Sequence, residues 1–91
     1  GQDKTSILFT IRDRVGALYR MLEPFAKNQI NLTKIESRPS RYRVWEYIFY
    51  VDIEGHVEDA PVKAALEGLQ EECLFVKVLG SYPKEPRRTK S

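Results

Sequence analysis

Cysteine, histidine and methionine are nearly absent from this sequence, which has one of each among 91 residues. With Cys73 alone, no disulfide can form within the chain, and this suits a reducing, cytoplasmic environment. His56 has no serine or cysteine near it, and the carboxylates are scattered, so neither a nucleophile–base pair nor the spacing of a metal site is present. No apolar run approaches membrane-spanning length, and no signal peptide is expected. These shortages argue against a disulfide scaffold, a metal centre, a membrane protein and hydrolytic catalysis.

Glycine and basic residues are also sparse where a phosphate or nucleic-acid site would need them. No lysine follows the five glycines in the phosphate-loop pattern. Residues 84–91 carry a charge of +3, so residues 1–83 must carry −1 to reach the net charge of +2, and they lack a nucleic-acid footprint. Trp45, Tyr47 and Phe49 alternate as in an RNA-binding sheet, but the basic-glycine-aromatic box of such sheets is missing. We expect these aromatics to be core residues beneath helices.

Apolar periodicity predicts six regular elements. Strict alternation indicates strands, and spacings of three and four indicate helices. The strands are expected over residues 4–12, 30–37, 42–53 and 74–79, and the helices over 15–28 and 60–72. The order βαββαβ with two right-handed crossovers predicts an α+β, ferredoxin-like fold, with a four-stranded antiparallel sheet and both helices on one face. The second strand then lies at a sheet edge, and the first and third strands are central.

One domain over residues 1–83 and a basic, disordered tail over residues 84–91 are the expected divisions of the chain. Pro39 is expected to stop the second strand, and Gly80 to end the fourth. Because the only methionine, Met21, lies inside the first predicted helix, we expect the chain to be a piece of a longer protein.

Each predicted helix carries an apolar stripe and a candidate cap. Asp13 and Asp59 are the expected N-caps, and Pro61 suits the first turn of the second helix. Pro24 lies inside the first stripe, so we expect a kink or local distortion there. Cys73 is expected to pack rather than to react. The stripes consist of Leu18, Met21, Leu22, Phe25 and Ala26 in the first helix, and of Val62, Ala65, Leu66, Leu69 and Cys73 in the second.

Two short segments could hold an amino acid by its two charged ends. Gly16 opens the first helix, and the backbone N–H groups of Gly16, Ala17 and Leu18 suit a carboxylate. Asn31 and the backbone groups of the strand that it opens suit an ammonium group. The candidate ligand-binding residues are Val15, Gly16, Ala17, Leu18, Asn31, Leu32, Thr33, Ile35, Glu36, Ser37 and Arg38.

The remaining candidates have supporting roles. An apolar side chain of the ligand would need a wall, for which Leu18, Leu32 and Ile35 are the candidates. We expect Glu36, Ser37 and Arg38 to form a corner between subunits rather than to touch the ligand's ring. Glu36 and Arg38 can also be read as an exposed charge pair on an edge strand, which would contribute about 0–1 kcal/mol.

The same segments carry a family resemblance. Gly16-Ala17-Leu18, followed by NLTKIESRP over residues 31–39, resembles the regulatory ACT domain of prephenate dehydratases. The WEY run at 45–47, Phe49, Gly55-His56 and the closing LGSYP at 79–83 are similar as well. The resemblance extends over about residues 4–83. Val15 departs from it, because family members often have proline at that position.

The resemblance implies an allosteric role in phenylalanine biosynthesis. L-phenylalanine would bind as a feedback inhibitor at an interface between two ACT domains, and the catalytic residues would lie in an upstream domain that this chain lacks. The implied partners are L-phenylalanine, that upstream domain and a second copy, paired through the second strand, with a tetramer of the parent left open. The resemblance implies no cofactor, metal, nucleic acid or membrane partner.

Three alternatives stay open. The regulatory domain of aromatic amino acid hydroxylases also has a Val-Gly-Ala-Leu run and an ESRPSR-like corner, but the WEY run and the LGSYP ending favour the dehydratase. A dimerisation module without a ligand would have the same fold. A small enzyme of the same fold, such as an acyl phosphatase, needs an anion-cradling loop; Arg14 and Asn31 are present, but no such loop is evident.

Overall fold

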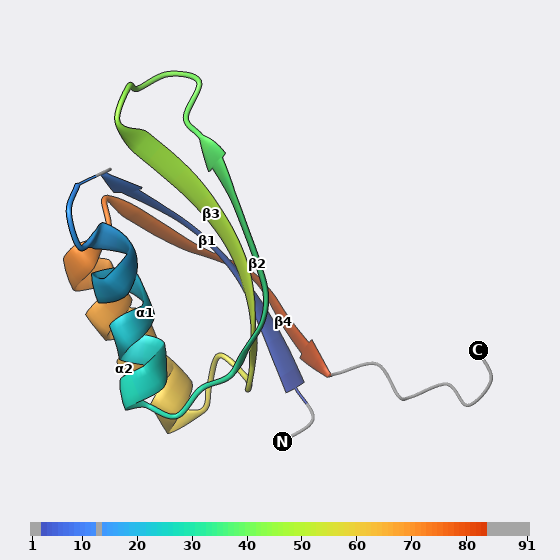
Figure 1. Cartoon of the computed structure of the whole chain (residues 1–91). Helices are drawn as coiled ribbons and strands as arrows, with labels where there is room; N and C mark the ends of the chain where they lie inside the picture. The colour runs from blue at the N-terminus through green and yellow to red at the C-terminus, as the bar shows by residue number, and fades with distance from the viewer. Residues whose placement is uncertain (1–2, 13, 84–91) are drawn as a thin grey trace.

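The computed structural model describes residues 3–12 and 14–83, and the predicted tail over residues 84–91 lies outside the described residues. The elements follow one another in the predicted order βαββαβ (Figure 1). They are β1 (Asp3–Arg12), α1 (Ala17–Lys27), β2 (Leu32–Pro39), β3 (Glu46–Glu54), α2 (Ala60–Glu72) and β4 (Phe75–Pro83).

The four strands form one antiparallel sheet in the order β2-β3-β1-β4. Both helices cover the same face of this sheet (Figure 1). The α+β, ferredoxin-like prediction is therefore confirmed, including the edge position of β2 and the central positions of β1 and β3. Because β1 ends where α1 begins, the turn between them lies at one end of the sheet.

The core lies between the sheet and the helices. Alternate residues of the two central strands point into it, as strand geometry requires. The rings of Phe9 and Phe49 stack across these strands with their centroids 5.4 Å apart. Burial of one such side chain stabilises the fold by about 1.5–3 kcal/mol. The buried apolar residues are Ile7, Phe9, Ile11, Met21, Phe25, Phe49, Val51, Ile53, Val62, Ala65 and Leu69.

Helix α1 begins two residues later than predicted, at Ala17. Its N-cap is Gly16, which makes no side-chain cap, and the predicted cap Asp13 lies outside the described residues. The stripe is also narrower than predicted. Leu18 is 50% exposed and Ala26 is exposed, because Met21 and Phe25 mark the side of the helix that meets the core.

The helix continues through Pro24 to Lys27. Pro24 lies against Gly68 of α2, where an added Cβ would come within 3.2 Å of the Pro24 Cβ. Proline in α1 and glycine in α2 therefore form a close contact between the two helices. The bounds of α2 agree with the prediction, and Pro61 lies in its first turn. Asp59 is the N-cap, but its carboxylate accepts the His56 N–H (2.9 Å) instead of capping the helix.

The strand ends differ most from the predictions. β3 begins at Glu46, not at residue 42, and Trp45 has a φ of 73° and is 69% exposed, so the prediction that it lies in the core is wrong. β2 starts at Leu32 and includes Pro39, which a strand at a sheet edge tolerates. β4 continues through Gly80, helped by an irregularity in its pairing with β1 beside Ser6.

Candidate functional site

The turn between β1 and α1 has an unusual backbone and unused hydrogen-bond donors. Gly16 has φ 80° and ψ 0°, and an added Cβ would meet nothing within 4 Å. The Ala17 N–H donates to the Arg14 carbonyl (3.0 Å), and the Arg20 N–H makes the first helical bond, to Gly16 (3.0 Å). The N–H groups of Leu18 and Tyr19 lie between them and have no partner among the described residues. These two donors, and not the predicted Ala17 N–H, are available to an anion.

A hollow of about 480 Å³ opens in front of this turn. Ile35 and Ser37 reach it because they lie opposite Val51 and Phe49 in the β2–β3 ladder, on the face of the sheet that carries the helices. Five predicted residues meet here: Gly16, Ala17, Leu18, Ile35 and Ser37. Ser37 lines this hollow, and its predicted place in a corner between subunits stays a prediction.

Five further residues complete the lining and were missed by the sequence analysis. Ile11 lies near the end of β1, Tyr47 and Phe49 lie near the start of β3, and Arg14 and Tyr19 flank the Gly16 turn. Tyr47 and Phe49 could have been found from the β2–β3 register, since each lies opposite a β2 residue on the helix side of the sheet. Arg14 adds a positive charge to a mostly apolar lining.

The predicted ammonium-binding segment lies elsewhere in the molecule. Asn31 lines a separate hollow of about 510 Å³, together with Glu54 and Asp59. The Thr33 hydroxyl donates to the Asp52 carbonyl (3.4 Å). Asn31 and Ser37 are six residues apart, which corresponds to about 20 Å along a strand. One copy of the chain therefore does not bring the two charged ends of the predicted site together.

The remaining candidates also point away from the hollow. Val15 is 97% exposed and does not line it. Glu36 and Arg38 lie on the face of the sheet that carries no helices, opposite Tyr50 and Ile48. Glu36 pairs with Lys34 (3.8 Å), and the Arg38 guanidinium lies over the Tyr50 ring, 5.9 Å from its centroid. The alternative Glu36–Arg38 pair is therefore not formed.

The described residues give little support for a reactive thiol, a metal site or a membrane-spanning helix. Burial and, to a smaller extent, the nearby Glu72 carboxylate raise the pKa of Cys73 to about 12, so the thiol stays protonated at neutral pH. Residues 3–12 and 14–83 contain no group of three or more His, Cys, Asp or Glu that could hold a metal ion. No helix in the described part of the chain is long and apolar enough to cross a membrane.

Comparison with known proteins gives one family and several close relatives. The family model of the ACT domain matches residues 5–71. A bifunctional chorismate mutase/prephenate dehydratase of Aquifex aeolicus is 61% identical over 84 residues, which are 92% of this chain and 23% of the relative. The chain thus spans about a quarter of the length of the curated relatives that it matches.

Two solved structures have the same fold and recognisable sequence similarity. A prephenate dehydratase from Arthrobacter aurescens in complex with L-Phe superimposes with a TM-score of 0.84 at 37% identity, over 96% of this chain and 30% of that chain. GqqA, described as a novel type of quorum-quenching acylase, gives a TM-score of 0.88 at 33% identity, over 93% of this chain and 31% of that chain.

Proposed function

Because the chain belongs to the ACT domain family, we propose that it is a regulatory domain that binds L-phenylalanine beside the Gly16 turn. The observation that carries this proposal is the hollow itself, in which two free N–H groups and an arginine adjoin an apolar floor. Its volume of about 480 Å³ falls within the range of about 300–1,000 Å³ that is usual for small-molecule sites. The relative solved with L-Phe supports this choice of ligand.

The ligand carboxylate would accept hydrogen bonds from the N–H groups of Leu18 and Tyr19, with the Arg14 guanidinium nearby. An anion at a helix start gains about 0.3–1 kcal/mol from the helix dipole. The phenyl ring would lie against Tyr47 and Phe49, which form the apolar side of the hollow. This arrangement selects an amino acid with a large apolar side chain.

The ammonium group would need a second copy of the chain, because Asn31 lies at the far end of β2. The Ser40 N–H donates to the Glu46 carbonyl (2.9 Å), and hydrogen-bonded pairs alternate along an antiparallel ladder. The backbone groups of Ile35 and Ser37 therefore point to the free edge of β2. Antiparallel pairing of two such edges would bring Asn31 of one copy toward the hollow of the other.

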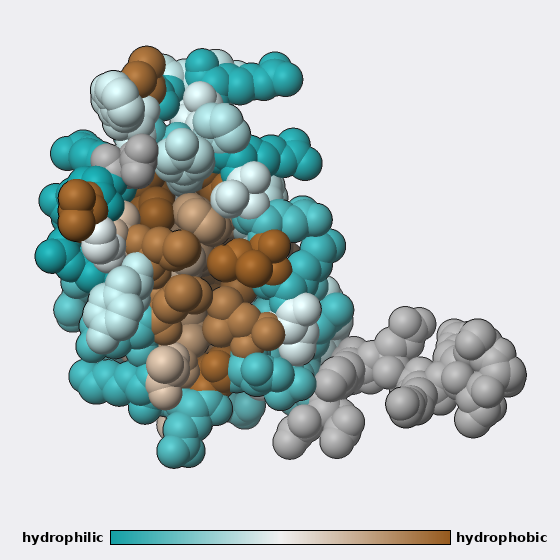
Figure 2. Space-filling model, viewed as in Figure 1, coloured by the Kyte–Doolittle hydropathy of each residue, from teal (hydrophilic) through white to brown (hydrophobic). Residues whose placement is uncertain are grey.

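Apolar surface beside this edge also supports a dimer. Figure 2 shows apolar side chains gathered between α1 and β2. Leu18 and Ile35 are about half exposed there, and Leu22 and Leu32 are only partly buried. A second copy on this side would cover them. Ligand binding at such an interface would stabilise one arrangement of the dimer only by its difference in affinity for the two arrangements.

The parent protein would be a prephenate dehydratase that phenylalanine inhibits. The curated relatives carry about three quarters of their length outside the matched part, and we place catalysis there. A coupling free energy of about 1–3 kcal/mol between the two sites would be usual for an allosteric enzyme.

Calorimetry and thermal melting of this chain with L-phenylalanine test the proposal. At about 100 times the Kd, a ligand that binds only the folded state raises the free energy of unfolding by about 2.7 kcal/mol. L-Alanine, which lacks the ring, and 3-phenylpropionate, which lacks the ammonium group, serve as controls and should bind more weakly. The absence of heat and of a melting shift at millimolar L-phenylalanine would contradict the proposal and favour a dimerisation module without ligand.

Sedimentation velocity tests the dimer separately. We expect a dimer at tens of micromolar chain, strengthened by L-phenylalanine. Replacing Ile35 with Lys on the edge strand should yield a monomer that keeps its fold, since the side chain is half exposed. A monomeric wild-type chain with and without L-phenylalanine would count against pairing through β2.

A further inference from the structure

A small notch, separate from the two hollows described above, adjoins the Gly16 turn on the side away from β2. It has a volume of about 70 Å³ and lies between the end of β1, the start of α1 and the end of α2. Arg12, Arg14 and Arg20 line it, and Glu72 is the one acidic residue in its described lining. The Leu74 N–H donates to the Thr10 carbonyl (2.9 Å), which fixes the start of β4 against the end of β1.

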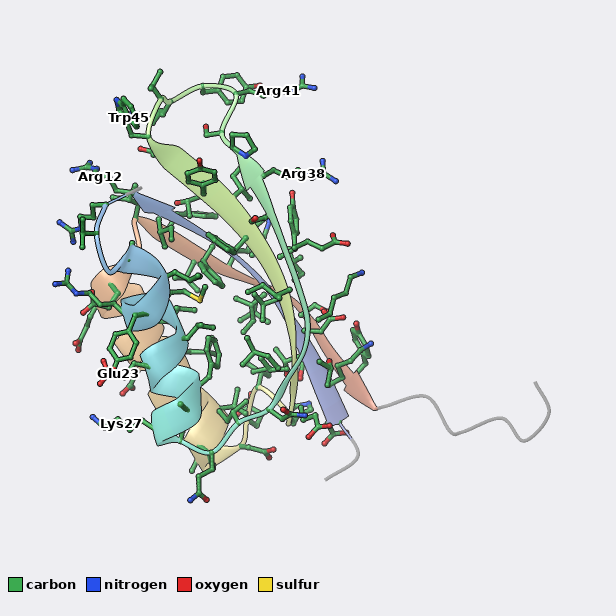
Figure 3. The ribbon with its side chains drawn as sticks, viewed as in Figure 1. Arg12, Glu23, Lys27, Arg38, Arg41 and Trp45 are labelled. Atoms are coloured by element: carbon green, nitrogen blue, oxygen red, sulfur yellow. The ribbon has the colours of Figure 1, made fainter. Side chains whose placement is uncertain are left out.

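Acidic residues offset the positive charge of this notch only in part, although Arg20 also lines a neighbouring hollow with Glu23 and Glu71. None of the three arginines makes an ion pair within the described residues, Glu72 included. Glu46 lies opposite Arg12 in the β1–β3 ladder, but its carboxylate pairs with Arg43 (3.9 Å). Figure 3 shows the Arg12 side chain extending outward at the end of β1, above the turn into α1. Among the described lining residues, three arginines and one glutamate give a net charge of +2, which favours an anion.

We propose that this notch binds a phosphate group, either free or carried by a small metabolite. A phosphate monoester carries a charge of about −1.5 to −2 at neutral pH, which matches the net charge of the lining. The planar guanidinium fork suits phosphate oxygens better than an ammonium group does. With a volume of about 70 Å³, the notch has room for one such group but not for a larger ligand.

This site is distinct from the proposed phenylalanine site, although Ile11, Arg14 and Ala17 border both. Of these two sites, Glu72 and Leu74 line the notch and not the larger hollow, whereas Ile35 and Ser37 line the larger hollow and not the notch. Amide shifts at these two pairs of residues therefore report which site an anion occupies. The test uses no phenylalanine, so its failure would leave the proposed function untouched.

The experiment is a titration of the chain with inorganic phosphate, followed by backbone amide NMR at constant ionic strength. We expect saturable shifts at Glu72 and Leu74 at millimolar phosphate. The double variant Arg12→Gln/Arg20→Gln should weaken binding about tenfold, and Glu72→Gln should strengthen it about threefold, since exposed charges act by such modest factors. Arg41→Glu lowers the net charge by the same two units, but in the β2–β3 loop (Figure 3), and should change the affinity less than twofold.

Three results would overturn the assignment. The first is no saturable shift at Glu72 and Leu74, or a shift only at Ile35 and Ser37. The second is an equal loss of affinity in Arg41→Glu and in the double variant, because binding would then follow net charge alone. The third is acetate binding the notch as tightly as phosphate, which would assign it to carboxylates. Far-UV circular dichroism of each variant checks that the fold is kept.

Discussion

Two glycines with a left-handed backbone precede the two helices, yet their surroundings differ. Gly16 before α1 has a φ of 80°, and Gly55 before α2 has a φ of 115°. A Cβ added to Gly55 would lie 2.8 Å from Cγ2 of Val62, whereas a Cβ added to Gly16 would meet no atom within 4 Å. The two turns therefore share a left-handed glycine but differ in the space in front of it.

The hydrogen bonds of the two turns differ in the same way. At the Gly55 turn, the Val57 N–H donates to Oγ of Ser81 (2.9 Å), which lies 2.9 Å from Oγ1 of Thr5. The Thr5 hydroxyl in turn donates to the Gly55 carbonyl (2.7 Å), and the Gly55 N–H donates to Asp3 (2.8 Å). Within the described residues, the Gly16 turn has no comparable network, and its Leu18 and Tyr19 N–H groups have no partner. One half of the βαββαβ fold thus holds its turn by hydrogen bonds, and the other half leaves space and donors in front of its turn.

The largest expected effect comes from adding a side chain at Gly55. Gly55→Ala should lower the free energy of unfolding by about 2–4 kcal/mol, because it combines backbone strain with a steric clash against Val62. The matched variant Gly16→Ala carries the backbone strain alone, about 1–2 kcal/mol. Urea denaturation of both variants measures the difference. Equal losses would mean that the space around the two glycines is irrelevant to stability.

A second substitution removes the hydrogen bond from Thr5 to the Gly55 carbonyl and leaves Gly55 itself unchanged. Thr5 is fully buried, and Thr5→Val would take the Thr5 hydroxyl away from the Gly55 carbonyl and leave the Ser81 hydroxyl with only the Val57 N–H. An unsatisfied buried group costs about 1–3 kcal/mol, which urea denaturation can resolve. Thr33→Val is the control, since its exposed hydroxyl makes only a 3.4 Å bond, and its loss should stay within about 0.5 kcal/mol. Similar losses in both variants would contradict the network's role.

A third substitution tests whether the Gly16 turn binds a ligand. Gly16→Val should lower stability by about 1–2 kcal/mol through its backbone, and it should abolish phenylalanine binding because the side chain would enter the space left for the carboxylate. Gly16→Asn tolerates the left-handed backbone better and should keep more stability while still weakening binding. Calorimetry and melting on the same samples separate the two effects. A folded Gly16→Val chain with normal affinity would place the ligand elsewhere.

The smallest effect concerns Cys73, the C-cap residue of α2. Its pKa rises from 9.0 to about 12 in the folded chain, so below pH 9 the thiol is protonated in both states. Above pH 9 the unfolded chain releases the proton first, and the free energy of unfolding falls as the pH approaches 12. Cys73→Ala should lack this part of the decline. Melting curves from pH 8 to pH 11 that run parallel for both proteins would show that the thiol is not protected.

Much of the fold followed from local pattern in the sequence. Helix α2 has the bounds that its apolar spacing predicts, because Asp59 and Pro61 mark its start and no competing signal intervenes. The strand ends were less predictable. Residues 42–45 have the composition of a strand, but the β2–β3 ladder closes at Pro39 and Tyr47, so they form the loop between these strands.

The sequence by itself determined the βαββαβ order, the buried faces of the central strands and the glycine turn that opens α1, because each depends on neighbours within a few residues. Only the tertiary structure decided that Tyr47 and Phe49 meet that turn, since their positions depend on strand register. It also decided that Asn31 lies far from the turn, because an eight-residue strand extends over about 26 Å. The role of Thr5, which connects β1 to the Gly55 turn and to β4, likewise depends on tertiary contacts, because its hydrogen-bond partners lie 50 and 76 positions away in the sequence.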